Sequence, residues 1–138
     1  MTHKKKKFAA MLVSALTLAA ASVAGLSIPD EAQAATNCNA TQACYWDGYN
    51  FTGTGPKVMT KCIRSFAYYS FDNKASSAYN NGVQDNLSVY TGSYASGTKG
   101  TIYRGNGGNL SGAFNNTISS AYFASYDKSA YWSSSTCI

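Results

Sequence analysis

The hydrophobic and polar positions divide the chain into two unequal parts. Residues 8–26 form an almost unbroken apolar run, whereas the chain beyond residue 35 has only short apolar runs separated by Gly, Asn and Ser. This second part shows no helical period and is rich in Tyr, Phe, Val and Thr, which is typical of strands joined by turns. The clearest predicted strands are residues 87–90 and 101–103. The pattern therefore predicts an all-β domain.

The apolar run has the flanks of a secretory signal. Lys4 to Lys7 precede it, and Ala32-Gln33-Ala34 follows it as a small-x-small cleavage pattern. A basic segment, an apolar segment and such a site together indicate export and removal of residues 1–34. An uncleaved membrane anchor is the alternative, but the cleavage pattern favours release. We expect a secreted, extracellular protein of residues 35–138 with no membrane association after cleavage.

The exported part contains an internal repeat. Residues 71–79 (FDNKASSAY) align with residues 114–122 (FNNTISSAY) at an offset of 43, with six of nine positions identical. Upstream of each copy lies an aromatic-x4-aromatic-x-Gly frame, at residues 46–53 and again at residues 90–97, where Ala95 replaces the second aromatic. Two features that repeat at nearly one offset indicate duplication of a whole unit.

Each unit is long enough for four short strands, which suggests a Greek key. Two such units packed face to face form a double Greek-key β-sandwich. The predicted units are about residues 44–82 and 87–123, followed by a tail at residues 124–138. Gly53 and Gly97 are expected at sharp bends where a side chain would clash.

All four cysteines lie in the exported part, at positions 38, 44, 62 and 137. An even number in a small secreted domain predicts two disulfides that stabilise a small core. Three pairings are conceivable, and we favour Cys38–Cys44 with Cys62–Cys137. A zinc site is disfavoured, since there is no C-x2-C spacing and no histidine in this part of the chain.

Composition argues against several function classes. His3 and Glu31 are the only histidine and glutamate, and both leave with the signal. Without them a Ser-His-Asp device or a zinc hydrolase cannot be built, so we expect no enzyme. Residues 35–138 carry a formal net charge of +3, with no clustered Lys or Arg, so we expect no nucleic-acid partner. We also expect a monomer.

The repeated motifs resemble the βγ-crystallin Greek key. That family combines the aromatic-x4-aromatic-x-Gly hairpin with (Asn/Asp)-(Asn/Asp)-x-x-(Ser/Thr)-Ser, and residues 72–77 and 115–120 both match the second element. With its export signal and cysteines, the chain looks like peptidase inhibitor family I36, which includes a Streptomyces metalloproteinase inhibitor. The resemblance implies an extracellular protease, most simply a metalloprotease, as partner.

The same resemblance implies weak Ca²⁺ binding at two sites, each built from both motifs. Calcium prefers oxygen ligands, which these segments supply. Backbone carbonyls near Asp47 and Gly92 could complete the shells. The alternative is that these side chains only tie down turns. The candidate ligands are Asp72, Asn73, Ser76, Asn115, Asn116 and Ser119.

Four functions remain open at this point. The first is a secreted peptidase inhibitor, and the second is a calcium-binding structural or stress protein without an enzyme target. The third is a killer-toxin-like antimicrobial, and the fourth is carbohydrate binding through exposed aromatics. Fold alone does not choose between them. The aromatic candidates for the fourth are Tyr68, Tyr69, Tyr126, Tyr131 and Trp132.

Overall fold

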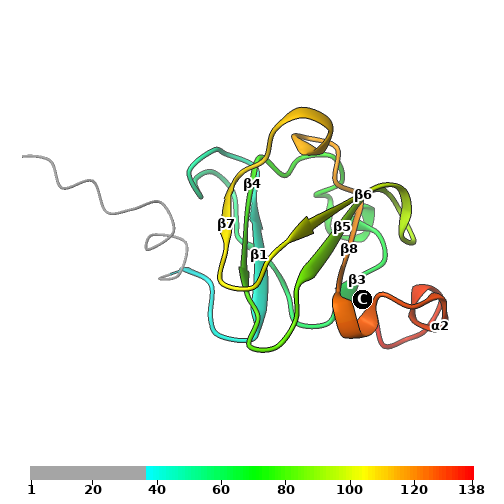
Figure 1. Ribbon diagram of the computed structural model, residues 1–138. Coiled ribbons are helices and arrows are strands. Elements are labelled where there is room, and N and C mark those ends of the chain that lie inside the picture. The colour runs from blue at the N-terminus through cyan, green and yellow to red at the C-terminus, as the bar shows by residue number, and fades with distance from the viewer. Residues whose placement is uncertain (1–36) are drawn as a thin grey trace, which may run out of the picture.

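The computed structural model describes residues 37–138 (Figure 1), and the signal predicted for residues 1–34 lies outside this range. The described chain is almost entirely β, as predicted, and none of its helices is long and apolar enough to cross a bilayer. Its elements are β1 (Gln42–Trp46), β2 (Lys57–Met59), β3 (Cys62–Ile63), η1 (Phe66–Tyr69), β4 (Ser77–Asn81), β5 (Leu87–Gly92), β6 (Ser96–Ile102), β7 (Gly107–Asn109), η2 (Gly112–Phe114), β8 (Ser120–Phe123), η3 (Ala124–Tyr126) and α2 (Ser129–Trp132).

The strands form two antiparallel four-stranded sheets that face each other (Figure 1). The strand orders are β2-β1-β4-β7 in the first sheet and β3-β8-β5-β6 in the second. Strands β1 to β4 come from the first repeat and β5 to β8 from the second. Each repeat therefore gives its third strand, β3 or β7, to the sheet of the other repeat. This is the double Greek-key β-sandwich that the repeat predicted.

Side chains on both faces of each sheet are buried. The inner faces form one core that includes Tyr45, Leu87 and Phe123, each 4% exposed or less. The outer face of the first sheet carries a smaller cluster around Trp46 and Tyr79. The second sheet carries an outer-face cluster of Cys62, Tyr90, Tyr122 and Cys137. Because the central strands β1, β4, β5 and β8 are buried on both faces, they lack the alternation of buried and exposed residues that is expected of a half-buried sheet.

The two disulfides bind the end segments to these outer faces. Cys38 pairs with Cys44 in β1, and Cys62 in β3 pairs with Cys137 near the end of the chain, which is the pairing favoured from the sequence. The segment from η3 to Cys137, called the tail below, lies over the outer face of the second sheet, and Tyr126, Tyr131 and Trp132 pack against its cluster.

An ion pair fixes the start of the tail. Asp127 accepts hydrogen bonds from Tyr90 Oη at 2.6 Å and from Lys99 Nζ at 2.5 Å, and its side chain is 8% exposed. Burial alone would raise the pKa of Asp127, but the hydrogen bonds from Lys99, Tyr90 and Ser88 outweigh it and lower the pKa below its ordinary value. The carboxylate form therefore stabilises the fold.

We expect the protein to lose stability as the pH falls below about 4. A depressed pKa in the folded state contributes stability above the pKa of the unfolded state, and this contribution disappears as the carboxylate becomes protonated. Urea denaturation at pH 7 and pH 3 would measure the loss, and Asp127→Asn should show a smaller difference between the two pH values. An unchanged difference in Asp127→Asn would contradict the assignment.

Candidate functional site

The two hairpins that open the repeats have the same geometry. Gly53 has a φ of 89° and Gly97 a φ of 77°, a conformation that favours glycine. A Cβ on Gly53 would lie 2.1 Å from Asp47 Oδ1, and one on Gly97 would lie 2.5 Å from Thr91 Oγ1. Both glycines thus sit at bends without room for a side chain, as predicted. Ala95 keeps the left-handed φ of its counterpart Phe51, so the substitution does not change the bend.

The second serine of each motif holds its own hairpin. Ser77 Oγ donates to Gly48 O at 2.7 Å and accepts from Phe51 N at 3.0 Å. Ser120 Oγ donates to Gly92 O at 2.6 Å and accepts from Ala95 N at 3.1 Å. Both serines are fully buried. The sequence offered a backbone carbonyl near Gly92 as a metal ligand, and the carbonyl of Gly92 itself accepts this hydrogen bond.

The first serine of each motif reaches the other repeat. Ser76 Oγ donates to Asn116 Oδ1 at 3.0 Å, and Ser119 Oγ donates to Asn73 Oδ1 at 3.2 Å. The backbone follows the same rule, because Asn116 N donates to Ala75 O and Asn73 N donates to Ile118 O. The structure therefore brings the six candidate ligands into two groups that each combine both motifs.

The leading residue of each motif has a buried oxygen without a hydrogen-bond partner. These atoms are Asp72 Oδ1 and Asn115 Oδ1, which are equivalent in the repeat. Asp72 uses its other oxygen to accept from Asn73 Nδ2 at 3.1 Å. Asn115 uses its amide nitrogen to donate to the hydroxyl of Tyr49, in the first hairpin, at 3.0 Å. Buried polar atoms are normally paired, so two equivalent orphans require an explanation.

The chemistry of these groups suits a hard cation. Each group contains a serine hydroxyl and the side-chain oxygens of two Asn or Asp residues, which are the oxygen donors that Ca²⁺ prefers. No three His, Cys, Asp or Glu side chains gather within residues 37–138, and only one of the six candidates is a carboxylate. The donor set thus fits calcium but offers it little negative charge.

Most of the aromatic candidates for carbohydrate binding are partly buried. Tyr68 is 61% exposed, but Tyr69 packs against the core and the other three pack against the outer-face cluster of the second sheet. Tyr68 instead pairs with Tyr94, with 2.5 Å between the two hydroxyl oxygens. Of the five aromatics, only Tyr68 is therefore largely exposed.

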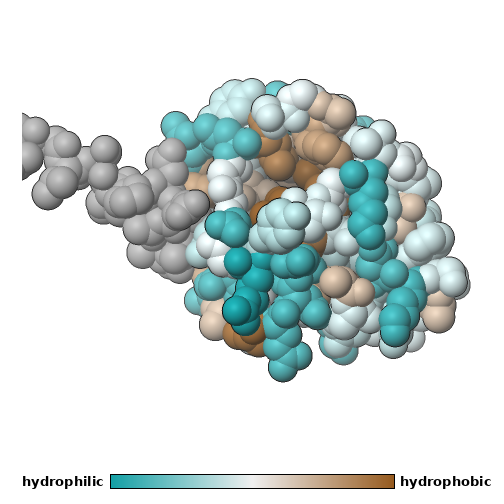
Figure 2. Space-filling view, viewed as in Figure 1, coloured by the Kyte–Doolittle hydropathy of each residue, from teal (hydrophilic) through white to brown (hydrophobic). Residues whose placement is uncertain are grey.

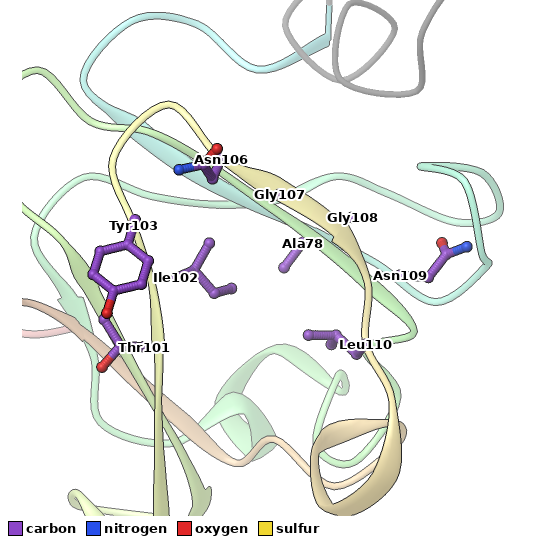
Figure 3. A pocket seen from close by; sticks show the side chains of 9 residues that line it. All are labelled: Ala78, Thr101, Ile102, Tyr103, Asn106, Gly107, Gly108, Asn109 and Leu110. Carbon is purple, nitrogen blue, oxygen red and sulfur yellow. The ribbon is translucent and has the colours of Figure 1, made fainter.

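An apolar slot opens between the edge strands β6 and β7 (Figure 3). Its volume is about 250 Å³, and Ile102, at the end of β6, and Leu110, just after β7, point toward its interior. Figure 2 shows hydrophobic side chains at the bottom of a hollow on this face. The sandwich is thus not closed along these two edges.

Sequence reasoning treated Ser77 and Ser120 only as motif positions, although they set the shape of both hairpins. The sequence did contain a hint of this role. Both repeats have serine at this position, although several other polar residues would suit a turn there. Sequence reasoning also assigned nothing to Arg64, whose Nε is buried without a partner. A single arginine in a sequence carries no such signal, because its burial depends on the tail.

Comparison with known proteins agrees with this geometry. A sequence profile of peptidase inhibitor family I36 matches residues 31–102, just over half of the chain. The chain belongs to peptidase inhibitor family I36. Membership of this inhibitor family agrees with the expectation that the chain is not an enzyme. No curated protein sequence matches it significantly.

Solved structures place this I36 member among βγ-crystallin folds. One, described as "Evolution of the eye lens beta-gamma-crystallin domain fold", has a TM-score of 0.55 and 17% identity, over 63% of this chain and 89% of that one. A βγ-crystallin from Ciona intestinalis has a TM-score of 0.52 and 13% identity, over 59% of this chain and 98% of that one. At such identity the likeness establishes the fold alone.

Proposed function

We propose that the protein is a secreted inhibitor of an extracellular metalloprotease. The observation that carries this proposal is the I36 profile match over residues 31–102. A basic and apolar leader with a cleavage pattern supports export. The physical form of the molecule supports inhibition, because a small sandwich braced by two disulfides presents its loops in a fixed shape. A rigid ligand loses little conformational entropy on binding, which strengthens the complex.

The chain would act by surface complementarity rather than by removing the metal of the protease. All four cysteines are in disulfides, and residues 37–138 contain no histidine. Thiolate and imidazole are the groups with which proteins commonly bind zinc. Inhibition should therefore persist in the presence of added zinc, whereas inhibition by chelation would disappear.

The secreted protein should reduce the activity of a thermolysin-type metalloprotease in proportion to the molar ratio, with a sharp end point near one inhibitor per enzyme. The measurement is residual peptidase activity across an inhibitor titration, with and without excess zinc. A reduced and alkylated sample is the matched control and should lose inhibition, because the loops are no longer braced. Full activity of several metalloproteases at large excess would favour the calcium-binding structural alternative.

We further propose that the two crosswise groups bind calcium. One group comprises Ser76, Asn115 and Asn116, and the other comprises Asp72, Asn73 and Ser119. The partnerless oxygens of Asp72 and Asn115 favour this over a purely structural role. A bound cation would supply the positively charged partner that these two oxygens lack. The residues themselves hold the loops of both repeats together, so binding should stabilise the whole sandwich.

Calcium should bind weakly, with a Kd on the order of 10⁻⁴–10⁻³ M, because neutral amides and hydroxyls offset the dehydration of a dication less well than carboxylates do. At ten times the Kd, each occupied site should raise the free energy of unfolding by about 1.4 kcal/mol. Calorimetric titration and thermal melting measure both quantities.

Asp72→Asn should weaken binding at one site without unfolding the protein. The matched control is Asp85→Asn, since Asp85 lies outside both groups and accepts from Ser125 Oγ. Ser76→Ala and Ser119→Ala should each remove one ligand. Absence of both heat and a melting shift at about 10 mM calcium, well above the expected Kd, would mean that the motifs are only well-tied turns.

A further inference from the structure

The tips of the two hairpins differ at two adjacent positions. The first hairpin has Asn50 followed by Phe51, whereas the second has Tyr94 followed by Ala95. All four residues have a left-handed backbone, with φ between 53° and 59°. The two tips thus share one backbone conformation, and the aromatic residue comes second in the first hairpin but first in the second hairpin.

This exchange moves an aromatic ring from the interior to the surface. Phe51 is 4% exposed, and its ring centroid lies 5.1 Å from that of Trp46 and 6.3 Å from that of Tyr79. In the second hairpin the equivalent inward position is filled by Ala95, which packs against the outer-face cluster of the second sheet. The aromatic residue of this tip, Tyr94, is instead 42% exposed.

Neither difference favours the stability of the second hairpin. Asparagine adopts the left-handed conformation readily, whereas tyrosine does so at a conformational cost, so Tyr94 is less favourable than Asn50. Ala95 also buries less apolar surface than Phe51 does. Residues held in costly conformations are concentrated at functional sites, where local rules of stability are broken. Two adjacent departures at one exposed tip therefore point to a role in binding.

A second exposed tyrosine lies against the first. Tyr68 of η1 is 61% exposed, and its hydroxyl oxygen lies 2.5 Å from that of Tyr94. The segments that carry the two residues are also joined to each other. Ser65 Oγ, at the start of η1, lies 2.9 Å from Ser93 Oγ, and Tyr94 N donates to Arg64 O at 2.7 Å. The two tyrosines therefore have a fixed relative position, although they come from different repeats.

The size of this exposed pair indicates what kind of partner it fits. Tyrosine is enriched at the energetic centres of protein interfaces, because it offers a large contact area and loses little conformational entropy on binding. Tyr68 and Tyr94 together expose about 250 Å². A stable dimer buries at least about 1,200 Å², so the pair alone would not hold a second copy of the chain. Its area suits an anchor that enters a pocket of a larger partner.

We propose that Tyr94, flanked by Tyr68, anchors this protein to the metalloprotease that it inhibits. The inference rests on the proposed inhibitor function and adds a binding surface to it. The matching surface of the protease is a pocket with apolar walls that admits the ring of Tyr94. Because the hairpin already holds this ring outward, little conformational freedom is lost when the complex forms.

Tyr94→Asn tests the anchor, because it gives the second hairpin the residue that the first hairpin has at this position. The inhibition constant for a thermolysin-type metalloprotease should rise at least about tenfold. The melting temperature should rise by about 4 °C, since asparagine removes the conformational cost. The matched control is Tyr103→Asn, at a tyrosine that is 63% exposed and has no left-handed backbone. This control should leave the inhibition constant unchanged.

Three further variants separate the ring from the backbone. Tyr94→Gly also relieves the backbone and removes the ring, so it should lose inhibition in the same way and replaces Tyr94→Asn if that variant fails to fold. Tyr94→Phe keeps the ring and should retain most of the inhibition. Tyr68→Ala removes the flanking ring and should weaken inhibition by a smaller factor than Tyr94→Asn does.

The possible failures of this proposal and of the inhibitor function can be told apart. Unchanged inhibition by folded Tyr94→Asn would overturn the anchor and leave the inhibitor function intact. An equal loss in Tyr103→Asn would overturn the anchor as well, because the effect would not be specific to the hairpin tip. A melting temperature lowered in Tyr94→Asn would show that the tyrosine supports the fold instead. No inhibition of any metalloprotease by the unmodified protein would remove the proposed function and the anchor with it.

Discussion

Replacing Cys62 and Cys137 together by alanine is expected to lower the free energy of unfolding by about 4 kcal/mol. The bond closes a loop with a sequence separation of 75 residues, so its removal restores much conformational freedom to the unfolded chain. It also releases the tail from the outer face of the second sheet. Urea denaturation of the variant and of the unmodified protein gives the difference directly.

The other disulfide is a matched control for this experiment. Cys38 and Cys44 are separated by only 6 residues, so replacing both by alanine should cost about 2 kcal/mol. The two pairs have equally buried side chains, which makes the change in packing similar. A larger loss from the Cys38–Cys44 pair than from the Cys62–Cys137 pair would contradict the loop-length argument.

Asn80→Ala should destabilise the protein by about 3 kcal/mol, because Asn80 connects segments that no strand pairing joins. This side chain is fully buried. Its Nδ2 donates to Asp85 O at 3.1 Å and to Ile102 O at 3.0 Å, and its Oδ1 accepts from Gly82 N at 2.9 Å. Alanine would leave all three backbone groups without this partner.

Asn81→Ala is the control for the same strand end. Its side chain is half-buried and makes one hydrogen bond, from Nδ2 to Cys38 O at 2.6 Å, so the expected loss is about 1 kcal/mol. Chemical denaturation of both variants measures the two losses. A loss for Asn80→Ala no larger than that for Asn81→Ala would show that the connection is dispensable.

The sequence predicts the fold well because the repeat leaves a signal that is independent of strand patterns. The hairpin frames and the Asn-Ser segments recur at nearly one offset, and both mark bends that glycine and asparagine favour. Strand boundaries are harder to predict. Residues 87–90 lie within β5, but β6 begins at Ser96 rather than at residue 101 and ends at Ile102. The residues of β6 are mostly small and polar, so the extent of this strand is set by its pairing with β5 rather than by its own residue pattern.

The exchange of β3 and β7 between the sheets could not be predicted from local pattern. β3 has two residues and β7 has three, too few for any periodicity, and their partners are chosen by packing of distant segments. The motif points to the six candidate calcium ligands, whereas the unpaired oxygens of two of them, Asp72 and Asn115, emerge only from burial. Arg64 has no motif, because its environment is created by a tail more than sixty residues away in the sequence.

The exchanged strands make the two repeats inseparable. Without β3 the second sheet loses one of its edges, and without β7 the first sheet does. A single unit cut out of the chain would therefore leave core side chains uncovered and strand edges open to association. A single unit would need a second copy of itself to complete both sheets. Because both copies lie in one chain, this pairing is intramolecular and does not depend on protein concentration.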